Sequence, residues 1–182
     1  MPHKTLLSLS AFAVILACLA FFGSTSYAQS GFSLTSTAFT AGNTIPVANS
    51  CTGNNDSPAL TWSGTPAGTN SFVLILSDPD APRGTFIHWV AFDIPGTATS
   101  LPAGVPHVDE IPGGGEQGMN GAAKIGYIGP CPPPGKVHHY HFTLYALNAT
   151  INLPKGASLT AVKSAMEAHV IGKTELVGTF SR

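Results

Sequence analysis

The sequence carries little charge of either sign. Only 9% of its 182 residues are Asp, Glu, Lys or Arg, and the formal net charge is −1, whereas about 25% is usual in soluble proteins. No basic run or stripe occurs. Nucleic acid is therefore not an expected partner, because binding to a phosphate backbone depends on clustered Lys and Arg.

Long helical patterns and internal repeats are also missing. Fifteen prolines and twenty glycines are spread along the chain, and each favours turns over helix interiors. We expect a mainly β protein with few short helices, and apart from its N-terminal segment the chain is expected to fold as a single domain, residues 29–182.

Cysteine is scarce, with only three in the whole chain. Cys18 lies in the apolar N-terminal segment, which leaves Cys51 and Cys131 as an even pair. In an oxidising compartment the simplest interpretation is a Cys51–Cys131 disulfide. The alternative is two free thiols too far apart to bond.

The first 28 residues have the pattern of a secretory signal. A basic start with Lys4 precedes the mostly apolar segment Leu6–Phe22, and Ser26-Tyr27-Ala28 gives small residues before Gln29. We predict a signal peptide of residues 1–28 and an exported protein, periplasmic or secreted, with no transmembrane segment in the mature chain. A membrane anchor and a lipoprotein lipidated at Cys18 are the alternatives.

Two apolar runs around a polar turn form the most informative stretch. Phe72–Leu76 is typical of a strand buried on both faces, and Phe86–Ile94 is a second strand rich in aromatic and β-branched residues. The turn between them holds Asp78 and Asp80, and His88 lies near the start of the second strand. These side chains are expected at one rim of a sheet.

Further elements follow from the same patterns. Strands are predicted over 32–39, 60–62, 138–147 and 176–180, a helix over 157–170 with Gly172 as its stop, and a long irregular segment over 95–126. In the strand 138–147, His138 and Tyr140 share one face, and His139 and His141 share the other. We expect His139 and His141 to face solvent, and Trp89 and Phe92 to pack in the core.

Three kinds of chemistry fit the polar side chains. Asp and His can bind a metal, but no pair of histidines one helical turn apart occurs, and no metal or cofactor is expected. A hydrolase would use His88 or His138 with an Asp and a serine such as Ser77, but the Gly-x-Ser-x-Gly motif is missing. The protein is therefore not expected to be an enzyme. Simple capping of the turn is the third interpretation, and it is expected for one of the two aspartates.

Four segments together carry a family resemblance: Asp78-Pro79-Asp80-Ala81-Pro82, Phe86–Val90, Gly129–Pro133 and His138–Leu147. In these motifs the chain resembles the bacterial and archaeal branch of the phosphatidylethanolamine-binding proteins. The resemblance extends over nearly all of residues 32–180. It implies a large central β-sheet packed against a smaller one, with a small anion pocket at one end.

The resemblance also implies the pocket residues and the ligand. They are Asp78, Asp80, His88, Pro130, Cys131, Pro132, His138 and Tyr140. Imidazole, phenol and loop N–H groups would donate to a phosphate or a phospholipid head group, and a buried Asp would orient a histidine. Because some family members inhibit kinases or proteases, a protein target is the alternative partner.

The chain departs from the family pattern at two places. His139 stands where a basic residue is common, which removes a fixed positive charge from the rim. The segment 105–121 is unusually rich in glycine.

Overall fold

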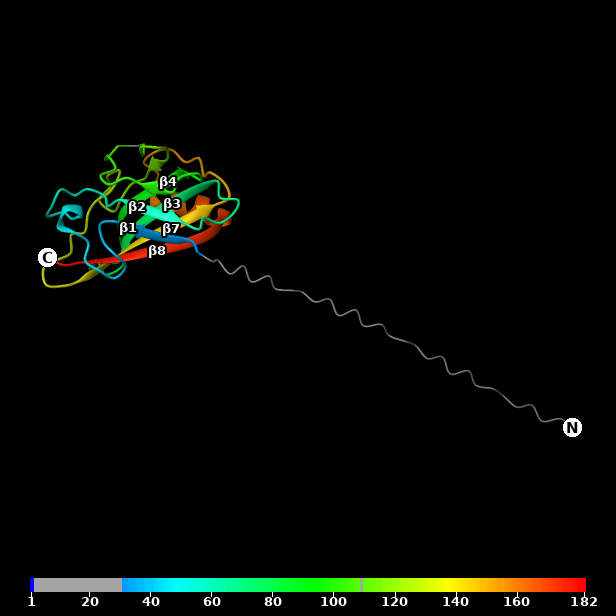
Figure 1. The fold of residues 1–182 in the computed structure, drawn as a ribbon, viewed down its shortest axis with the longest axis horizontal. Coiled ribbons are helices and arrows are strands. Elements are labelled where there is room, and N and C mark those ends of the chain that lie inside the picture. The colour runs from blue at the N-terminus through cyan, green and yellow to red at the C-terminus, as the bar shows by residue number, and fades with distance from the viewer. Residues whose placement is uncertain (2–30, 109) are drawn as a thin grey trace.

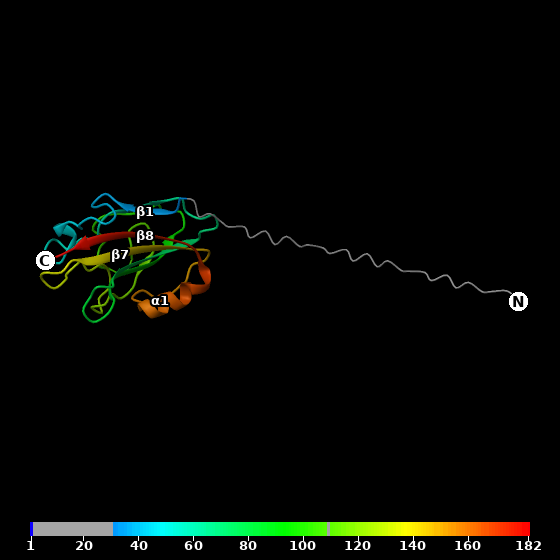
Figure 2. The same cartoon turned by 90° about the horizontal axis from the view of Figure 1, so that it is seen from below.

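Three layers make up the fold (Figures 1 and 2). The computed structural model describes Met1, residues 31–108 and residues 110–182. A three-stranded sheet of order β1-β2-β5 and a five-stranded sheet of order β6-β4-β3-β7-β8, both antiparallel, form two layers, and helix α1 lies on the far side of the larger sheet. The predicted class is confirmed: a mainly β fold with a large sheet against a small one.

The elements have the following bounds. The strands are β1 Ser33–Ser36, β2 Leu60–Ser63, β3 Ser71–Asp78, β4 Phe86–Pro95, β5 Ser100–Leu101, β6 Glu116–Gln117, β7 His138–Leu147 and β8 Val170–Phe180. The helices are α1 Leu159–Met166 and two 3-10 turns, Val47–Asn49 and Glu167–His169. The predicted signal peptide, including Cys18, lies outside the described residues apart from Met1.

The central strand β3 separates two hydrophobic cores. Its side chains alternate, so that Phe72, Leu74 and Leu76 pack toward the small sheet. Val73 and Ile75 pack on the opposite face, in a cluster that also contains Val162 and Met166 of α1. This two-sided burial explains why the strand reads as a continuous apolar run.

The small sheet closes the larger core. Leu34 of β1 pairs with Trp62 of β2, and the Trp62 indole meets the Phe72 ring edge-on at 5.3 Å between centroids. The first strand is shorter than the predicted 32–39, ending at Ser36, whose hydroxyl donates to the carbonyl of Ala59 at 2.7 Å.

The C-terminal helix ends earlier than predicted. Ser158 caps α1 by accepting a hydrogen bond from the Ala161 N–H, but the α-helix ends at Met166 and a strand begins at Val170. Gly172 is not a helix stop: it lies within β8 and pairs with Ala146. The helical periodicity of 157–170 is overridden there by pairing with β7, which helical propensity alone does not reveal.

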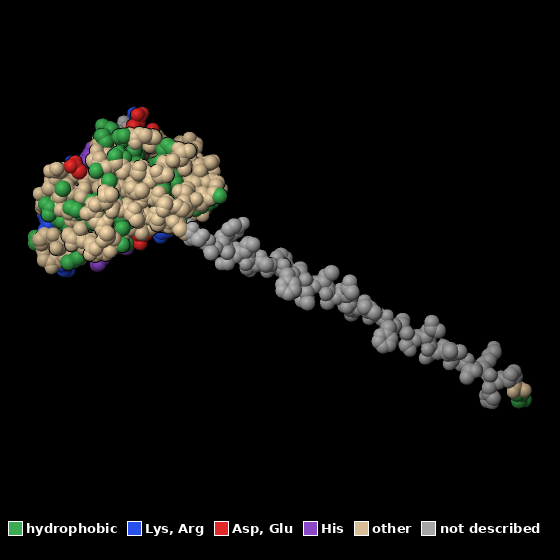
Figure 3. Space-filling view, in the orientation of Figure 1, with side chains coloured by type: hydrophobic (Ala, Val, Ile, Leu, Met, Phe, Trp, Pro, Cys, Tyr) green, Lys and Arg blue, Asp and Glu red, His purple; other side chains and the backbone are tan. Residues whose placement is uncertain are grey.

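The surface is sparsely charged. On the face seen in Figure 3, acidic and basic side chains are scattered rather than gathered into one patch, as the low charged fraction predicts. Among the helices of the described residues, none has the length and apolar character needed to cross a membrane.

Candidate functional site

A buried hydrogen bond between an aspartate and a histidine joins the end of β3 to the start of β7. The two strands are antiparallel, with Ser77 opposite His141, and the side chain of Asp78 reaches His138, two residues beyond the position opposite to it. Nδ1 of His138 donates to Oδ2 of Asp78 at 2.8 Å. Residues Asp78 and His138 are 3% and 2% exposed. The other carboxylate oxygen of Asp78 accepts the backbone N–H of Asp80 at 2.9 Å, which fixes the carboxylate in place.

A second histidine enters from β4. His88 is 4% exposed, and its Nδ1 donates to the carbonyl of Ile128 at 2.7 Å. Its ring lies edge-on between Phe86, at 4.8 Å, and Tyr140, at 5.2 Å. Burial lowers the pKa of His88, and the Ile128 carbonyl and the Asp78 carboxylate oppose part of that effect. Burial therefore favours the neutral form of this ring.

Tyr140 brings a buried hydroxyl to the same place. The residue is fully buried, and its hydroxyl has no hydrogen-bond partner among the described residues. Burial and the Asp78 carboxylate raise the pKa of Tyr140, while the backbone amide of Cys131 opposes the rise. The phenol therefore keeps its proton and is available as a donor. A buried hydroxyl without a partner is unusual, because it loses water and gains no bond in return.

The loop 128–135 forms the opposite wall of a cavity of about 270 Å³. The cavity is lined by Asp78, Ala81, Pro82, Phe86, His88, Ile128, Gly129, Cys131, Pro132, Pro133 and His138. Most of this lining is apolar, and the polar groups are confined to the Asp78–His138 pair and His88. Such a small apolar cavity with a few convergent polar groups is typical of a ligand site.

Several bonds hold that wall in position. Cys51 and Cys131 are joined by a disulfide, as predicted, and the Cys51 N–H donates to the Pro130 carbonyl at 3.1 Å. Arg182 donates from Nε to the Pro132 carbonyl at 2.6 Å. Residues Pro130 and Pro132–Pro134 have no N–H to offer.

Backbone donors are consequently few in this wall. The Gly129 N–H is already bonded to Oδ1 of Asn55 at 2.7 Å. Among residues 129–134 the Cys131 N–H is therefore the remaining backbone donor. This amide opposes the rise in the pKa of Tyr140.

The structure brings together five of the eight residues expected at the pocket: Asp78, His88, Cys131, Pro132 and His138 line the cavity. Tyr140 packs against His88, and Pro130 lies in the same loop without lining it. Asp80 lies outside: its Oδ2 accepts both the N–H and the Nδ1–H of His139 at 2.8 Å. These bonds to His139 lower the pKa of Asp80, which caps the start of β7 at the surface.

The neighbouring histidines of β7 lie as the alternation predicts. His139 and His141 have side chains 54% and 31% exposed and pair with Asp80 and Glu175. Trp89 and Phe92 are fully buried. Trp89 also donates from its indole N–H to Oε1 of Gln117 at 2.7 Å.

Sequence reasoning missed part of the wall. Phe86 contacts the His88 ring, Ile128 bonds both the ring and the backbone of His88, and Pro82 extends the apolar lining. The closeness of Phe86 to His88 in β4, two residues away on the same face, was an available signal. Arg182 carries no pattern that would have marked it.

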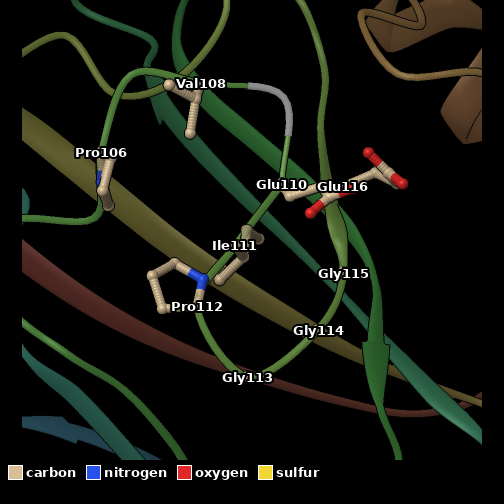
Figure 4. Close-up of a pocket in the computed structure, with 9 residues that line it drawn as sticks. All are labelled: Pro106, Val108, Glu110, Ile111, Pro112, Gly113, Gly114, Gly115 and Glu116. Atoms are coloured by element: carbon tan, nitrogen blue, oxygen red, sulfur yellow. The ribbon is translucent and has the colours of Figure 1, made fainter.

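A larger hollow of about 500 Å³ lies along the loop 106–116 (Figure 4). Figure 4 shows Glu110 and Glu116 near each other across this loop, where they form an isolated β-bridge. Among the described residues that line it, the titratable groups are these two carboxyl side chains, which do not suit an anion. Within residues 31–108 and 110–182 no cluster of three His, Cys, Asp or Glu side chains could hold a metal ion.

Comparison with known proteins identifies relatives of this chain. It is 46% identical over 145 residues to the UPF0098 protein of Methanothermobacter thermautotrophicus, covering 80% of this chain and 95% of that protein. It is 40% identical over 149 residues to a candidate lipoprotein, LppC, of Mycobacterium tuberculosis, covering 81% and 71%.

Solved structures show the same fold. The phosphatidylethanolamine-binding protein homologue CT736 of Chlamydia trachomatis superposes with a TM-score of 0.77 at 36% identity, covering 84% of this chain and 98% of that one. Escherichia coli YbcL gives 0.77 at 34% identity, covering 84% and 99%. The family model described as phosphatidylethanolamine-binding protein matches residues 35–181. This chain therefore belongs to the phosphatidylethanolamine-binding protein family, in its bacterial and archaeal branch.

Proposed function

We propose that this protein binds a small anion, with the cavity at His88 and His138 holding a phosphate group. The observation that carries the proposal is that two buried histidines, His88 and His138, line one cavity. Tyr140 packs against His88, and its buried hydroxyl has no acceptor among the described residues. The Nε2 atoms of the two histidines are the ring nitrogens that remain after both Nδ1 atoms have bonded.

The apolar lining supports the same ligand class. Phe86, Pro132 and Pro133 give the cavity apolar walls, and hydrogen bonds to a charged group are stronger in less polar surroundings than in water. The role that we propose for the cavity is binding.

Phosphate binding should weaken in a variant that removes Nε2 of His138. In His138→Asn the amide can still donate to Asp78 in place of Nδ1, but nothing replaces Nε2. We expect phosphate affinity to fall about tenfold to a hundredfold, since a hydrogen bond to a charged group contributes about 1.5–3 kcal/mol. Isothermal titration calorimetry with inorganic phosphate measures the change.

The matched control is His139→Asn. This residue is next in the strand but faces away from the cavity, with its side chain 54% exposed. Its affinity should equal that of the wild type. Equal losses in both variants, or no phosphate binding by the wild type, would contradict the proposed site and direct the search to a protein target.

We also propose that the protein is exported after cleavage before Gln29. The disulfide supports this, because such bonds persist in oxidising compartments. The relative LppC, a candidate lipoprotein, is consistent with an exported family member.

Intact mass spectrometry after expression of the full chain in a bacterium with a periplasm tests the cleavage site. The exported protein should begin at Gln29 and gain about two mass units on reduction, one hydrogen for each thiol formed. Recovery of a lipid-modified Cys18 would instead establish the lipoprotein alternative. Uncleaved protein retained in the cytoplasm would contradict export.

A further inference from the structure

The two histidines of the cavity differ in what their Nδ1 atoms bind. Nδ1 of His138 donates to a carboxylate, Asp78, whereas Nδ1 of His88 donates to a neutral backbone carbonyl, Ile128. Both rings line the cavity. In each ring the remaining nitrogen is Nε2, and the partner of Nδ1 decides whether that atom serves as a donor or an acceptor.

His138 bonds the carboxylate of Asp78, and both side chains line the cavity. An anion in the cavity and the buried Asp78 carboxylate are both negative, and enclosing two like charges without a cation between them is costly. A proton on each nitrogen of His138 supplies that cation. In the bound complex Nε2 of His138 is therefore a donor to the ligand.

The Nδ1 partner of His88 is a neutral carbonyl, so no negative charge on that partner favours a protonated ring. Its ring is packed between Phe86 and Tyr140, and burial lowers its pKa. The other charged or titratable groups around it are Asp78, already paired with His138, and Tyr140, which stays protonated. Neutral His88 with a proton on Nδ1 leaves a lone pair on Nε2, which accepts a hydrogen bond.

We propose that the cavity selects a phosphate group carrying a P–OH, with His138 donating to a P–O⁻ oxygen and His88 accepting from the hydroxyl. The proposal rests on the proposed function and narrows its ligand to free phosphate or the monoanion of a phosphomonoester. A phosphodiester, such as the head group of an intact phospholipid, has no P–OH. To bind, it must leave His88 unpaired or take one proton from solvent onto Nε2.

Methyl phosphate and dimethyl phosphate separate these ligand classes. At pH 5.5 most methyl phosphate carries a P–OH, because its second pKa is about 6. We expect it to bind about tenfold more tightly than dimethyl phosphate, which forfeits a buried hydrogen bond. Calorimetry in buffers of different ionisation enthalpy should show proton uptake with dimethyl phosphate that exceeds uptake with methyl phosphate.

His88→Gln separates this mechanism from exclusion by size. The Gln amide is neutral at every pH and can donate to a phosphate oxygen as well as accept. The preference for methyl phosphate should therefore fall to near equality. A preference unchanged in His88→Gln would overturn the proposal, because the second methyl group would then be excluded by shape.

The wild-type protein gives an independent test that does not depend on the variant folding. Nitrogen-15 NMR of the methyl phosphate complex should show His88 as a neutral ring with its proton on Nδ1, and His138 protonated on both nitrogens. A doubly protonated His88 would overturn the proposal. Equal affinity for the two ligands would overturn it while leaving the proposed function intact, whereas no binding of either ligand would overturn the proposed function itself.

Discussion

Asp78→Ala should destabilise the protein by about 3 kcal/mol or more, the cost of leaving a buried partner without its counterpart. The variant leaves Nδ1 of His138 without an acceptor and releases the N–H of Asp80. For a domain of about 150 residues this corresponds to a fall in Tm of roughly 10 °C. Urea denaturation followed by the fluorescence of the buried Trp62 and Trp89 measures the free energy of unfolding.

Asp80→Ala is the matched control. Asp80 also pairs with a histidine at 2.8 Å, but its side chain is 41% exposed and that of His139 is 54% exposed. Exposed pairs contribute less than about 1 kcal/mol, because water screens them and replaces the lost bonds. Equal losses in the two variants would mean that burial does not distinguish the two pairs.

The sequence predicted the main strands for a clear physical reason. Strands β3 and β7 are central in the large sheet, so their apolar runs and alternation reflect burial directly. The faces of His138 and His139 followed from a period of two residues. The cysteine pair predicted the disulfide. The four motifs predicted which residues lie at one end of the sheet.

The different roles of Asp78 and Asp80 could not be predicted from the pattern. Asp78 is the last residue of β3 and keeps the direction that the strand imposes. Asp80 lies two residues further on, in a turn where the strand period no longer applies. Its partner, the backbone N–H of His139, is 59 positions away, and only the folded register brings it near.

The end of α1 and the start of β8 are set by pairing with β7 rather than by local sequence pattern. The sequence predicts a helix that continues to residue 170, but Val170 pairs with Leu147 and begins β8. Arg182 reaches the pocket wall through a backbone carbonyl, Pro132. A single terminal residue bonding to a main-chain atom leaves no periodic or compositional signal in the sequence.

Removal of the disulfide should affect stability and ligand binding together. In the variant with Cys51→Ser and Cys131→Ser, we expect a loss of about 4 kcal/mol by the chain-entropy model, since the bond joins residues 80 apart in sequence. Cys131 also lines the cavity. Freeing this wall adds an ordering cost to binding, so phosphate affinity should fall about tenfold.

Arg182→Ala separates the two effects of the disulfide. It removes another tether of the same wall, the bond from Nε to the Pro132 carbonyl, but opens no covalent loop. Phosphate affinity should therefore fall as it does without the disulfide, while the free energy of unfolding changes by only about 1–2 kcal/mol. Denaturation and calorimetry on both variants measure the two quantities. If affinity stays at the wild-type value in both, the prolines and the remaining hydrogen bonds hold the wall in place, and the two tethers serve the stability of the fold rather than the shape of the pocket.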